Sequence, residues 1–262
     1  MMKNELLKKK VFVFDKDGTI SLGNKPQDGA VELFQFLDEL GKKVYVLTNN
    51  SSLTSLQHKR TLVEMGFPEG VFEVYSSTDA TIEYLKVSNL DKRVFLMAVK
   101  QVEEEFIRSG INLVEDDPEV LVLAFDKEMT YEKLKKFCLY LLEDRMYIAT
   151  HPDITCPTLE GPIPDVGSMI AAIKEATGRL PDMVIGKPNT IIMERLLSHA
   201  SVSREDVVIV GDRLETDMNL AKNLGIQGVL ISEHFAEVTN ADFIVFKHMR
   251  DFLGFIKNDS CV

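Results

Sequence analysis

Residues 11–20 read VFVFDKDGTI, and this stretch predicts a buried strand that ends in a chemically unusual way. Four apolar residues run directly into two carboxylates, Asp15 and Asp17, which are one residue apart. Like charges this close raise each other's cost of ionisation, so a proton, a cation or both must hold them. The first question is therefore what neutralises the two acids.

Length, composition and charge limit the classes of protein to which the chain can belong. The chain has 262 residues, enough for one large domain or for a domain with a substantial insertion. An apolar fraction of 45% fits a globular protein with a well-developed core. The formal net charge of −11 argues against a broad surface for nucleic acid or for an anionic membrane, because both need clustered Lys and Arg.

The cysteines and the apolar segments indicate where the protein works. Cys138, Cys156 and Cys261 are far apart and odd in number, so they form neither a metal-spaced pair nor a disulfide framework. A reducing cytosol is then the natural compartment. No apolar run approaches the roughly 18 residues of a membrane span, and no apolar segment follows the basic N-terminus as in a signal peptide. We expect a cytoplasmic monomer or homodimer with no nucleic acid and no membrane among its partners.

Apolar β-rich runs alternate with helical patterns along almost the whole chain, which indicates a parallel sheet built from βαβ units. The pattern predicts strands over residues 11–15, 44–48, 71–76, 93–99, 121–125, 147–150, 183–185, 207–210, 229–231 and 243–246. It predicts helices over residues 30–40, 56–65, 80–85, 131–142 and 169–176. Residues 150–168 carry four prolines and two glycines, so we expect a shaped loop there, because proline removes amide donors and breaks helices.

Four short polar segments follow apolar strands. They read DKDGT at 15–19, TNNS at 48–51, GKP at 186–188 and GDRLETD at 211–217. Ligands bind beyond the carboxyl ends of the strands in an open parallel sheet, so we expect all four segments at one edge of one sheet.

The residue types in these segments favour phosphoryl transfer. Asp15 and Asp212 offer the hard oxygen ligands that Mg²⁺ prefers, and a dication between them would relieve their repulsion. Thr48 and the amides after it can donate hydrogen bonds to phosphoryl oxygens, and Lys187 supplies a point charge. One carboxylate must then attack phosphorus, while another protonates the leaving alkoxide and later activates water.

In this order the segments resemble the four motifs of the haloacid dehalogenase superfamily, here FDKDGT, TNNSS, GKP and GDRLETD. TNNSS, TCPT, GKPN and GDRLETD are similar, more closely, to its NagD-like or 4-nitrophenylphosphatase-like branch, subfamily IIA. The resemblance covers nearly the whole chain. It implies an α/β fold, in which a Rossmann-like, doubly wound parallel sheet forms the core and an α/β cap is inserted.

The resemblance also implies the activity: a Mg²⁺-dependent phosphatase that forms an aspartyl-phosphate and acts on a small phosphorylated metabolite. The natural substrate stays open among sugar phosphates, glycerol phosphate, phosphoglycolate, pyridoxal phosphate and nucleotides, with 4-nitrophenyl phosphate as an expected substrate in vitro.

Carried over position by position, the resemblance assigns a role to each motif residue. Asp15 would be the nucleophile and Asp17 the general acid and base. Mg²⁺ would be held by Asp15, the main-chain carbonyl of Asp17, and Asp212, and Asp217 would support it from behind these ligands. The residues that would bind and neutralise the phosphoryl group are Thr48, Asn49, Asn50 and Lys187.

The family places its cap between the second and third motifs. The gap from Ser52 to Lys187 is far too long for one βα unit. We therefore expect a core made of residues 1–87 and 182–262 and a cap over residues 88–181. The loop at 150–168, with His151 and Cys156, is the candidate for substrate selection.

Three residues depart from the branch's usual pattern. Lys16 replaces an apolar residue, and its side chain should point away from Asp15 and Asp17 if the backbone is extended there. His151 stands where asparagine is more typical, and Asp165 where glycine is common. These departures leave the chemistry intact and put the identity of the substrate in doubt.

Other functions differ in how well they fit. Asp17 argues against a dehalogenase, which lacks the second aspartate. A sugar phosphomutase keeps both aspartates and stays open, because the sequence does not say whether the cap shields the phosphoenzyme from water. A non-catalytic phosphate-ligand sensor is the alternative from a different class, and metal-dependent turnover of 4-nitrophenyl phosphate would distinguish it from an enzyme.

Overall fold

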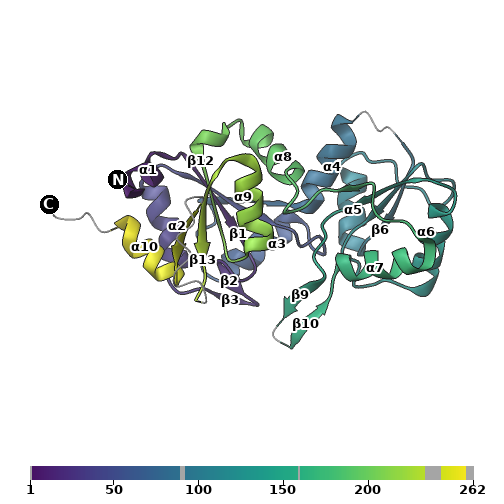
Figure 1. Cartoon of the computed structure of the whole chain (residues 1–262), viewed down its shortest axis with the longest axis horizontal. Coiled ribbons are helices and arrows are strands. Elements are labelled where there is room, and N and C mark those ends of the chain that lie inside the picture. Colours follow the sequence, from purple (N-terminus) through teal and green to yellow (C-terminus); the bar gives the residue numbers. More distant parts are fainter. Residues whose placement is uncertain (1, 89–91, 159, 234–242, 258–262) are drawn as a thin grey trace. The chain divides into compact units, whose positions relative to one another are not determined.

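The computed structural model describes residues 2–88, 92–158, 160–233 and 243–257 (Figure 1). Cys261 therefore lies outside the described residues. Contacts divide the chain into two compact units. The first contains residues 1–48, 56–75 and 197–262, and the second contains residues 49–55 and 76–196. Each unit is built around a parallel sheet of its own.

In the described part of the chain, the sheet of the first unit has six strands in the order β14-β13-β12-β1-β4-β5. Its strands β1, β12 and β13 are labelled in Figure 1. The strands are β1 (Val11–Asp15), β4 (Lys43–Thr48), β5 (Phe72–Ser76), β12 (Val207–Gly211), β13 (Gln227–Ile231) and β14 (Phe243–Phe246). From β1 the chain adds β4 and β5 on one side, and it later adds β12, β13 and β14 on the other. The strand order thus reverses between β1 and β12, which is where ligands bind in sheets of this type.

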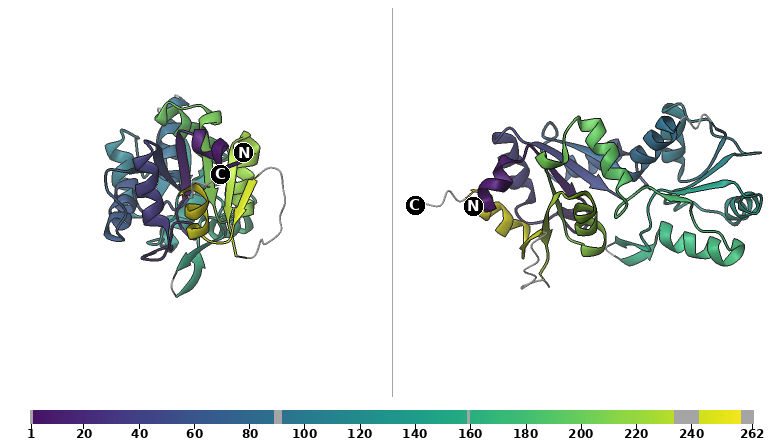
Figure 2. Two further views of the ribbon diagram at one scale, coloured as in Figure 1. Left: turned by 90° about the vertical axis from the view of Figure 1, so that its left-hand side faces the viewer. Right: turned by 45° about the horizontal axis from the view of Figure 1, so that its top comes forward.

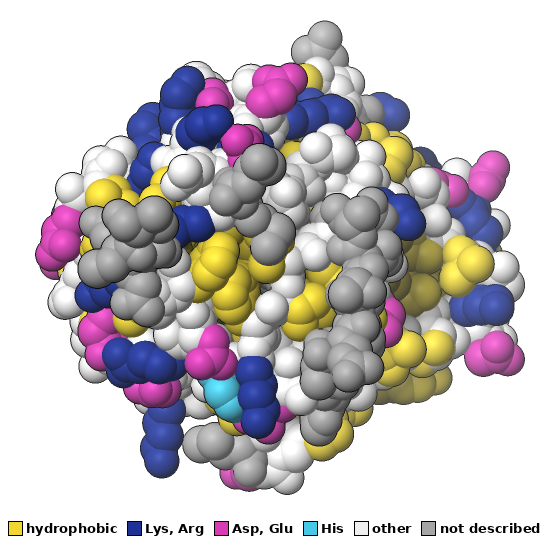
Figure 3. Space-filling model, turned by 60° about the vertical axis from the view of Figure 1, so that its left-hand side comes forward, with side chains coloured by type: hydrophobic (Ala, Val, Ile, Leu, Met, Phe, Trp, Pro, Cys, Tyr) yellow, Lys and Arg dark blue, Asp and Glu magenta, His cyan; other side chains and the backbone are white. Residues whose placement is uncertain are grey.

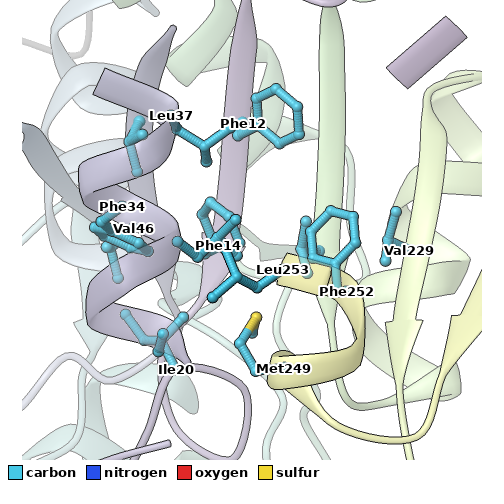
Figure 4. Close-up of a cluster of buried hydrophobic side chains, with 14 of the residues drawn as sticks. Phe12, Phe14, Ile20, Phe34, Leu37, Val46, Val229, Met249, Phe252 and Leu253 are labelled. Atoms are coloured by element: carbon cyan, nitrogen blue, oxygen red, sulfur yellow. The ribbon is translucent and has the colours of Figure 1, made fainter. Parts of the chain in front are cut away.

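Both faces of this sheet are buried at β1. Phe12 and Phe14 of β1 pack with helices on one face, as Figure 4 shows. The alternate residues, Val11 and Val13, point to the opposite face and are equally buried. Gly228 of β13 also lies on that opposite face, since it is in register with Ile209 and Val13, and a β-carbon there would lie 2.9 Å from the sulfur of Met218. The helices of this unit are α1 (Met2–Lys8), α2 (Ala30–Glu39), α3 (Ser55–Glu64), α9 (Asn219–Leu224) and α10 (Met249–Lys257).

Four parallel strands form the sheet of the second unit, in the order β11-β8-β7-β6. They are β6 (Val94–Met97), β7 (Val120–Leu123), β8 (Met146–Ala149) and β11 (Met183–Val184). Side chains of α6 and α7 pack on one face of this sheet around the buried Phe137 and Tyr147. The helices of this unit are α4 (Ser77–Val87), α5 (Lys100–Arg108), α6 (Tyr131–Leu141) and α7 (Val166–Thr177), and α8 (Ile191–Ala200) runs on into the first unit.

Two expectations about the fold are wrong. The strand before Lys187, β11, pairs with β8 in the second unit's sheet and not with the core strands. A strand of two residues carries too little pattern to show which sheet it joins. Residues 150–168, expected as a loop, contain an antiparallel hairpin of β9 (Thr155–Thr158) and β10 (Gly161–Pro164).

The hairpin tolerates proline because it has only two strands. Pro157 and Pro162 lie opposite each other, and each strand has an outer edge where a missing amide costs no ladder hydrogen bond. In Figures 1 and 2 the hairpin projects from the rest of the second unit. A smaller hairpin that the sequence did not reveal, β2 (Ser21–Leu22) with β3 (Lys25–Pro26), follows β1 directly.

The predicted α/β class, with a parallel core sheet and an inserted second parallel sheet, is confirmed. The expected cap, residues 88–181, lies within the second unit, which also takes in residues 76–87 and 182–196. The limits of the cap as a domain stay a prediction.

Candidate active site

The end of β1 lies between two strands that also end in polar residues. Asp15, the last residue of β1, pairs with Leu47 of β4, so Thr48 follows immediately on one side. Phe14 pairs with Val210 of β12, so Gly211 and then Asp212 follow on the other side. Thr48 is buried.

Three carboxylates come together here. One oxygen each of Asp15, Asp212 and Asp217 lies within 4.8 Å of the others. Asp217 is buried and belongs to a π-helical turn, Leu214–Met218, that follows β12. Bringing three acids this close costs free energy unless positive charge neutralises them. Hard carboxylate oxygens are the ligands that Mg²⁺ and Ca²⁺ prefer, so the group fits a divalent cation.

Thr19 connects two of these carboxylates. Its side chain is fully buried, and its hydroxyl oxygen lies 3.2 Å from Oδ2 of Asp15 and 2.9 Å from Oδ1 of Asp212. The hydroxyl has one proton, which it can donate to either carboxylate. Thr19 thereby links Asp15, near the start of the chain, to Asp212, far along it.

Two glycines make room for the carboxylates. A β-carbon at Gly18 would lie 2.3 Å from Oδ2 of Asp212, and one at Gly211 would lie 2.3 Å from the β-carbon of Asp217. Gly18 also has a φ of +104°, a conformation that strains other residues. Any side chain at either position would push a carboxylate away. The backbone is therefore shaped so that the acids can approach, as a cation site requires.

Lys16 does not point away from its neighbours, so that expectation is wrong. Its Nζ donates a hydrogen bond of 2.7 Å to Oδ1 of Asp17, and its side chain is only 8% exposed. The expectation assumed that the strand continues past Asp15. The strand ends there and the chain turns, so side chains no longer alternate between opposite faces.

A second group of predicted residues comes together in the second unit around Asn49. The side-chain oxygen of Asn49 accepts a hydrogen bond of 2.9 Å from the main-chain amide of Lys187, and its Nδ2 donates to the Lys187 carbonyl at 3.0 Å. Nδ2 also lies 3.2 Å from both carboxylate oxygens of Asp153. These partners occupy the amide of Asn49, so its side chain positions the Lys187 main chain.

His151 lies beside this group and is completely buried. Its Nδ1 is 3.7 Å from Asp153, and its Nε2 is 3.5 Å from Asp165. Both distances exceed the range of a hydrogen bond. Burial lowers the pKa of His151 to about 4, against an opposing effect from Asp153 and a reinforcing one from Lys187. The imidazole is therefore neutral at physiological pH.

The remaining cap residues have clear local roles. Asp165 begins α7, where its carboxylate accepts a hydrogen bond of 2.7 Å from the amide of Val166. Cys156, on β9, is partly buried, and its sulfur lies 3.8 Å from Nδ2 of Asn50. Asn50 and Cys156 are thus neighbours, although 106 residues separate them in the sequence.

The structure therefore gathers the predicted residues into two groups. Asp15, Asp17, Thr48, Asp212 and Asp217 lie in the first unit, and Asn49, Asn50, His151, Cys156 and Lys187 lie in the second. The sequence missed Thr19, Asp153 and the spacing role of the two glycines. Thr19 had a signal, since it belongs to the DKDGT segment, but its hydroxyl was given no role.

Two family models match the chain. One, haloacid dehalogenase-like hydrolase, covers residues 12–112, and another, for HAD-hydrolase-like proteins, covers residues 184–246. In the described ranges, each helix is too short or too polar to cross a bilayer.

Solved and curated relatives agree with these matches. The structure is similar to that of a 4-nitrophenylphosphatase from Thermotoga maritima, with a TM-score of 0.89 and 38% identity over 97% of this chain and 99% of that one. The 5'-nucleotidase YutF of Bacillus subtilis is 28% identical over 222 residues, 85% of this chain and 86% of that protein. An acid sugar phosphatase of Staphylococcus epidermidis is 29% identical over 219 residues, 83% of this chain and 84% of that protein.

Proposed function

We propose a reaction for this chain from one premise: it belongs to the haloacid dehalogenase superfamily, in the NagD-like, 4-nitrophenylphosphatase-like branch, and is a phosphatase of that type acting on small phosphate monoesters. The grouping of Asp15, Asp212 and Asp217 at the end of β1 is the observation that carries the proposal. It supplies a place for a cation beside a carboxylate that can attack phosphorus.

The cation that we propose is Mg²⁺. Asp15, Asp212 and the main-chain carbonyl of Asp17 would hold it, and Asp217 would orient its remaining ligands. When bound, it would neutralise the carboxylates and polarise a phosphoryl oxygen. Gly18 and Gly211 support this assignment, because they leave space for acids whose mutual repulsion a cation relieves.

The reaction that we propose has two steps. Asp15 attacks phosphorus and forms an acyl phosphate, while the bond to the leaving oxygen breaks and Asp17 gives that oxygen a proton. Water then attacks the same phosphorus, Asp17 takes a proton from it, and the bond between phosphorus and Asp15 breaks. Asp15 and Asp17 return to their starting states, so one water is consumed per ester.

Phosphoryl binding is assigned to Thr48, Lys187 and the main chain at Asn49 and Asn50. Thr48 has a hydroxyl to donate, and Lys187 would neutralise the phosphoryl charge. The Asn49 side chain is already bonded to Lys187 and Asp153, so we assign it to holding Lys187 in place. Cys156 and the β9–β10 hairpin are proposed to contact the leaving group.

We also propose that the enzyme works in a reducing cytosol as a monomer or homodimer. The substrate is a small phosphorylated metabolite, and we propose the sugar phosphate and nucleotide classes first, since relatives that cover most of this chain carry those activities in their names.

The test is turnover of 4-nitrophenyl phosphate, followed by a panel of sugar phosphates and nucleoside monophosphates with free phosphate as the readout. We expect EDTA to abolish turnover and Mg²⁺ to restore it. Asp212→Asn should weaken the response to Mg²⁺ by well over about 10-fold, because a charged ligand is lost. Asp206→Asn is the matched control, since this aspartate precedes β12 at its other end and pairs with Lys10. Full activity in EDTA would refute the cation site.

A further inference from the structure

Lys16 is a buried lysine beside the proposed acid and base. Lysine is almost never fully buried without a paired charge, because its ammonium loses water. The ammonium of Lys16 lies 2.7 Å from Oδ1 of Asp17, whose side chain is 25% exposed. Lys16 is thus the more buried member of the pair, and Asp17 keeps more contact with solvent.

The backbone around Lys16 is held firmly. Its carbonyl accepts hydrogen bonds of 3.1 Å from the amides of both Ile20 and Ser21, and the amide of Gly18 donates at 2.8 Å to the carbonyl of Ser21. Because the turn is closed on itself in this way, the base of the lysine side chain is fixed. A fixed, buried side chain holds its partner more rigidly than an exposed one.

We propose that Lys16 is a positioning residue that holds the carboxylate of Asp17 for proton transfer. The inference rests on the proposed function, in which Asp17 gives a proton to the leaving oxygen. The ammonium binds Oδ1 and so fixes the direction of the carboxylate, which leaves Oδ2 for the proton transfer to the leaving oxygen. Misplacement of a reacting group by about 1 Å can cost on the order of 10²-fold in rate.

Leaving groups of different basicity distinguish a role in proton transfer from a general effect of Lys16 on activity. 4-Nitrophenolate is a weak base and leaves with little help from a proton. The alkoxide of glycerol is a strong base and must be protonated as it leaves. Lys16→Met should therefore lower kcat/KM for glycerol phosphate by about 10- to 100-fold, mainly through kcat. It should lower kcat/KM for 4-nitrophenyl phosphate by less than about 3-fold. Lys16→Arg should recover part of the loss, because a guanidinium can also donate to Oδ1.

The matched control is Lys10→Met. Lys10 precedes β1 at its opposite end and pairs with Asp206 at 2.9 Å, so this variant removes the same charge away from the site. Lys10→Met should lower kcat/KM for both esters equally or for neither. An equal loss on both esters in Lys16→Met, or no loss on either, would overturn the proposal.

A second measurement does not depend on catalysis. In EDTA, the melting temperatures of Lys16→Met, Asp17→Asn and the double variant report whether the two residues are coupled. If the two residues form an ion pair, the double variant should lower the melting temperature by clearly less than the sum of the two single changes. Additive changes would overturn the ion pair. A wild type that hydrolyses no ester would refute the proposed function, and the melting measurement would still decide the pairing of Lys16 with Asp17.

Discussion

Acid should destabilise this protein through His151, and the size of the effect follows from burial. The imidazole is 0% exposed, and neither ring nitrogen has a hydrogen-bond partner among the residues that the structure describes. The charged groups that face it are Asp153, Asp165 and Lys187. Burial is the largest effect, and it lowers the pKa from 6.5 to about 4.

The sign of the pH dependence follows from proton uptake. Between pH 6.5 and pH 4 the unfolded chain protonates His151 while the folded protein does not. The unfolded state then binds more protons, so the free energy of unfolding falls as the pH falls. The contribution is complete above pH 6.5 and is lost as the pH drops toward 4. A difference of this size corresponds to about 2 kcal/mol at pH 5 and about 3 kcal/mol in the acid limit.

The assay is urea unfolding followed by far-ultraviolet circular dichroism, in EDTA, at intervals from pH 7.5 to pH 4.5. Other groups titrate in this range, so the comparison is between variants. His151→Asn places a neutral side chain there, and its free energy of unfolding should fall by about 2 kcal/mol less than that of the wild type between pH 7.5 and pH 5. His199→Asn is the control, because its side chain is 45% exposed. Parallel curves for the wild type and His151→Asn would refute the reasoning.

Three further predictions concern catalysis. Asp15→Asn should lose at least about 10³-fold in turnover of 4-nitrophenyl phosphate and keep its melting temperature, since only the nucleophile is removed; an active variant would mean another nucleophile. Gly18→Ala should weaken the response of the activity to Mg²⁺, because the new β-carbon would meet Asp212; an unchanged titration would show that the carboxylate can move aside. Across a panel of esters, Thr48→Ala should lower every kcat/KM by a similar factor. Cys156→Ala should lower kcat/KM by about 10- to 200-fold for some esters only, and so change their ranking. The opposite pattern would reverse these assignments.

The sequence predicted the strands of the core well because each is a continuous apolar run. The predicted strand at residues 11–15 has the bounds of β1, and the one at 44–48 differs from β4 by one residue. Runs of this kind are typical of strands in a parallel sheet that is covered on both faces. The helices predicted from spacing were also found, although α2 ends at Glu39 and leaves Leu40 exposed. The helices α1 and α5 were not predicted.

The sequence failed where a residue's position depends on its tertiary partners. The strand β11 is two residues long, and only its pairing with β8 shows which sheet it belongs to. Lys16 was expected to point away because the strand was assumed to continue, but the turn after Asp15 redirects it toward Asp17. Neither outcome could be read from local periodicity.

The same distinction explains which parts of the candidate site could be predicted. The type and position of a motif residue can be read from the sequence, so Asp15 and Asp212 were predicted as site residues. The group that joins them, Thr19, could not be assigned, because its contact with Asp212 spans 193 residues. The bonds between Asn49 and Lys187 span 138 residues and have the same character. A motif thus names the groups that we propose to react, whereas the groups that hold them in place become visible only when distant segments meet. Substitution of these holding residues should change rates without removing any atom that we propose to react.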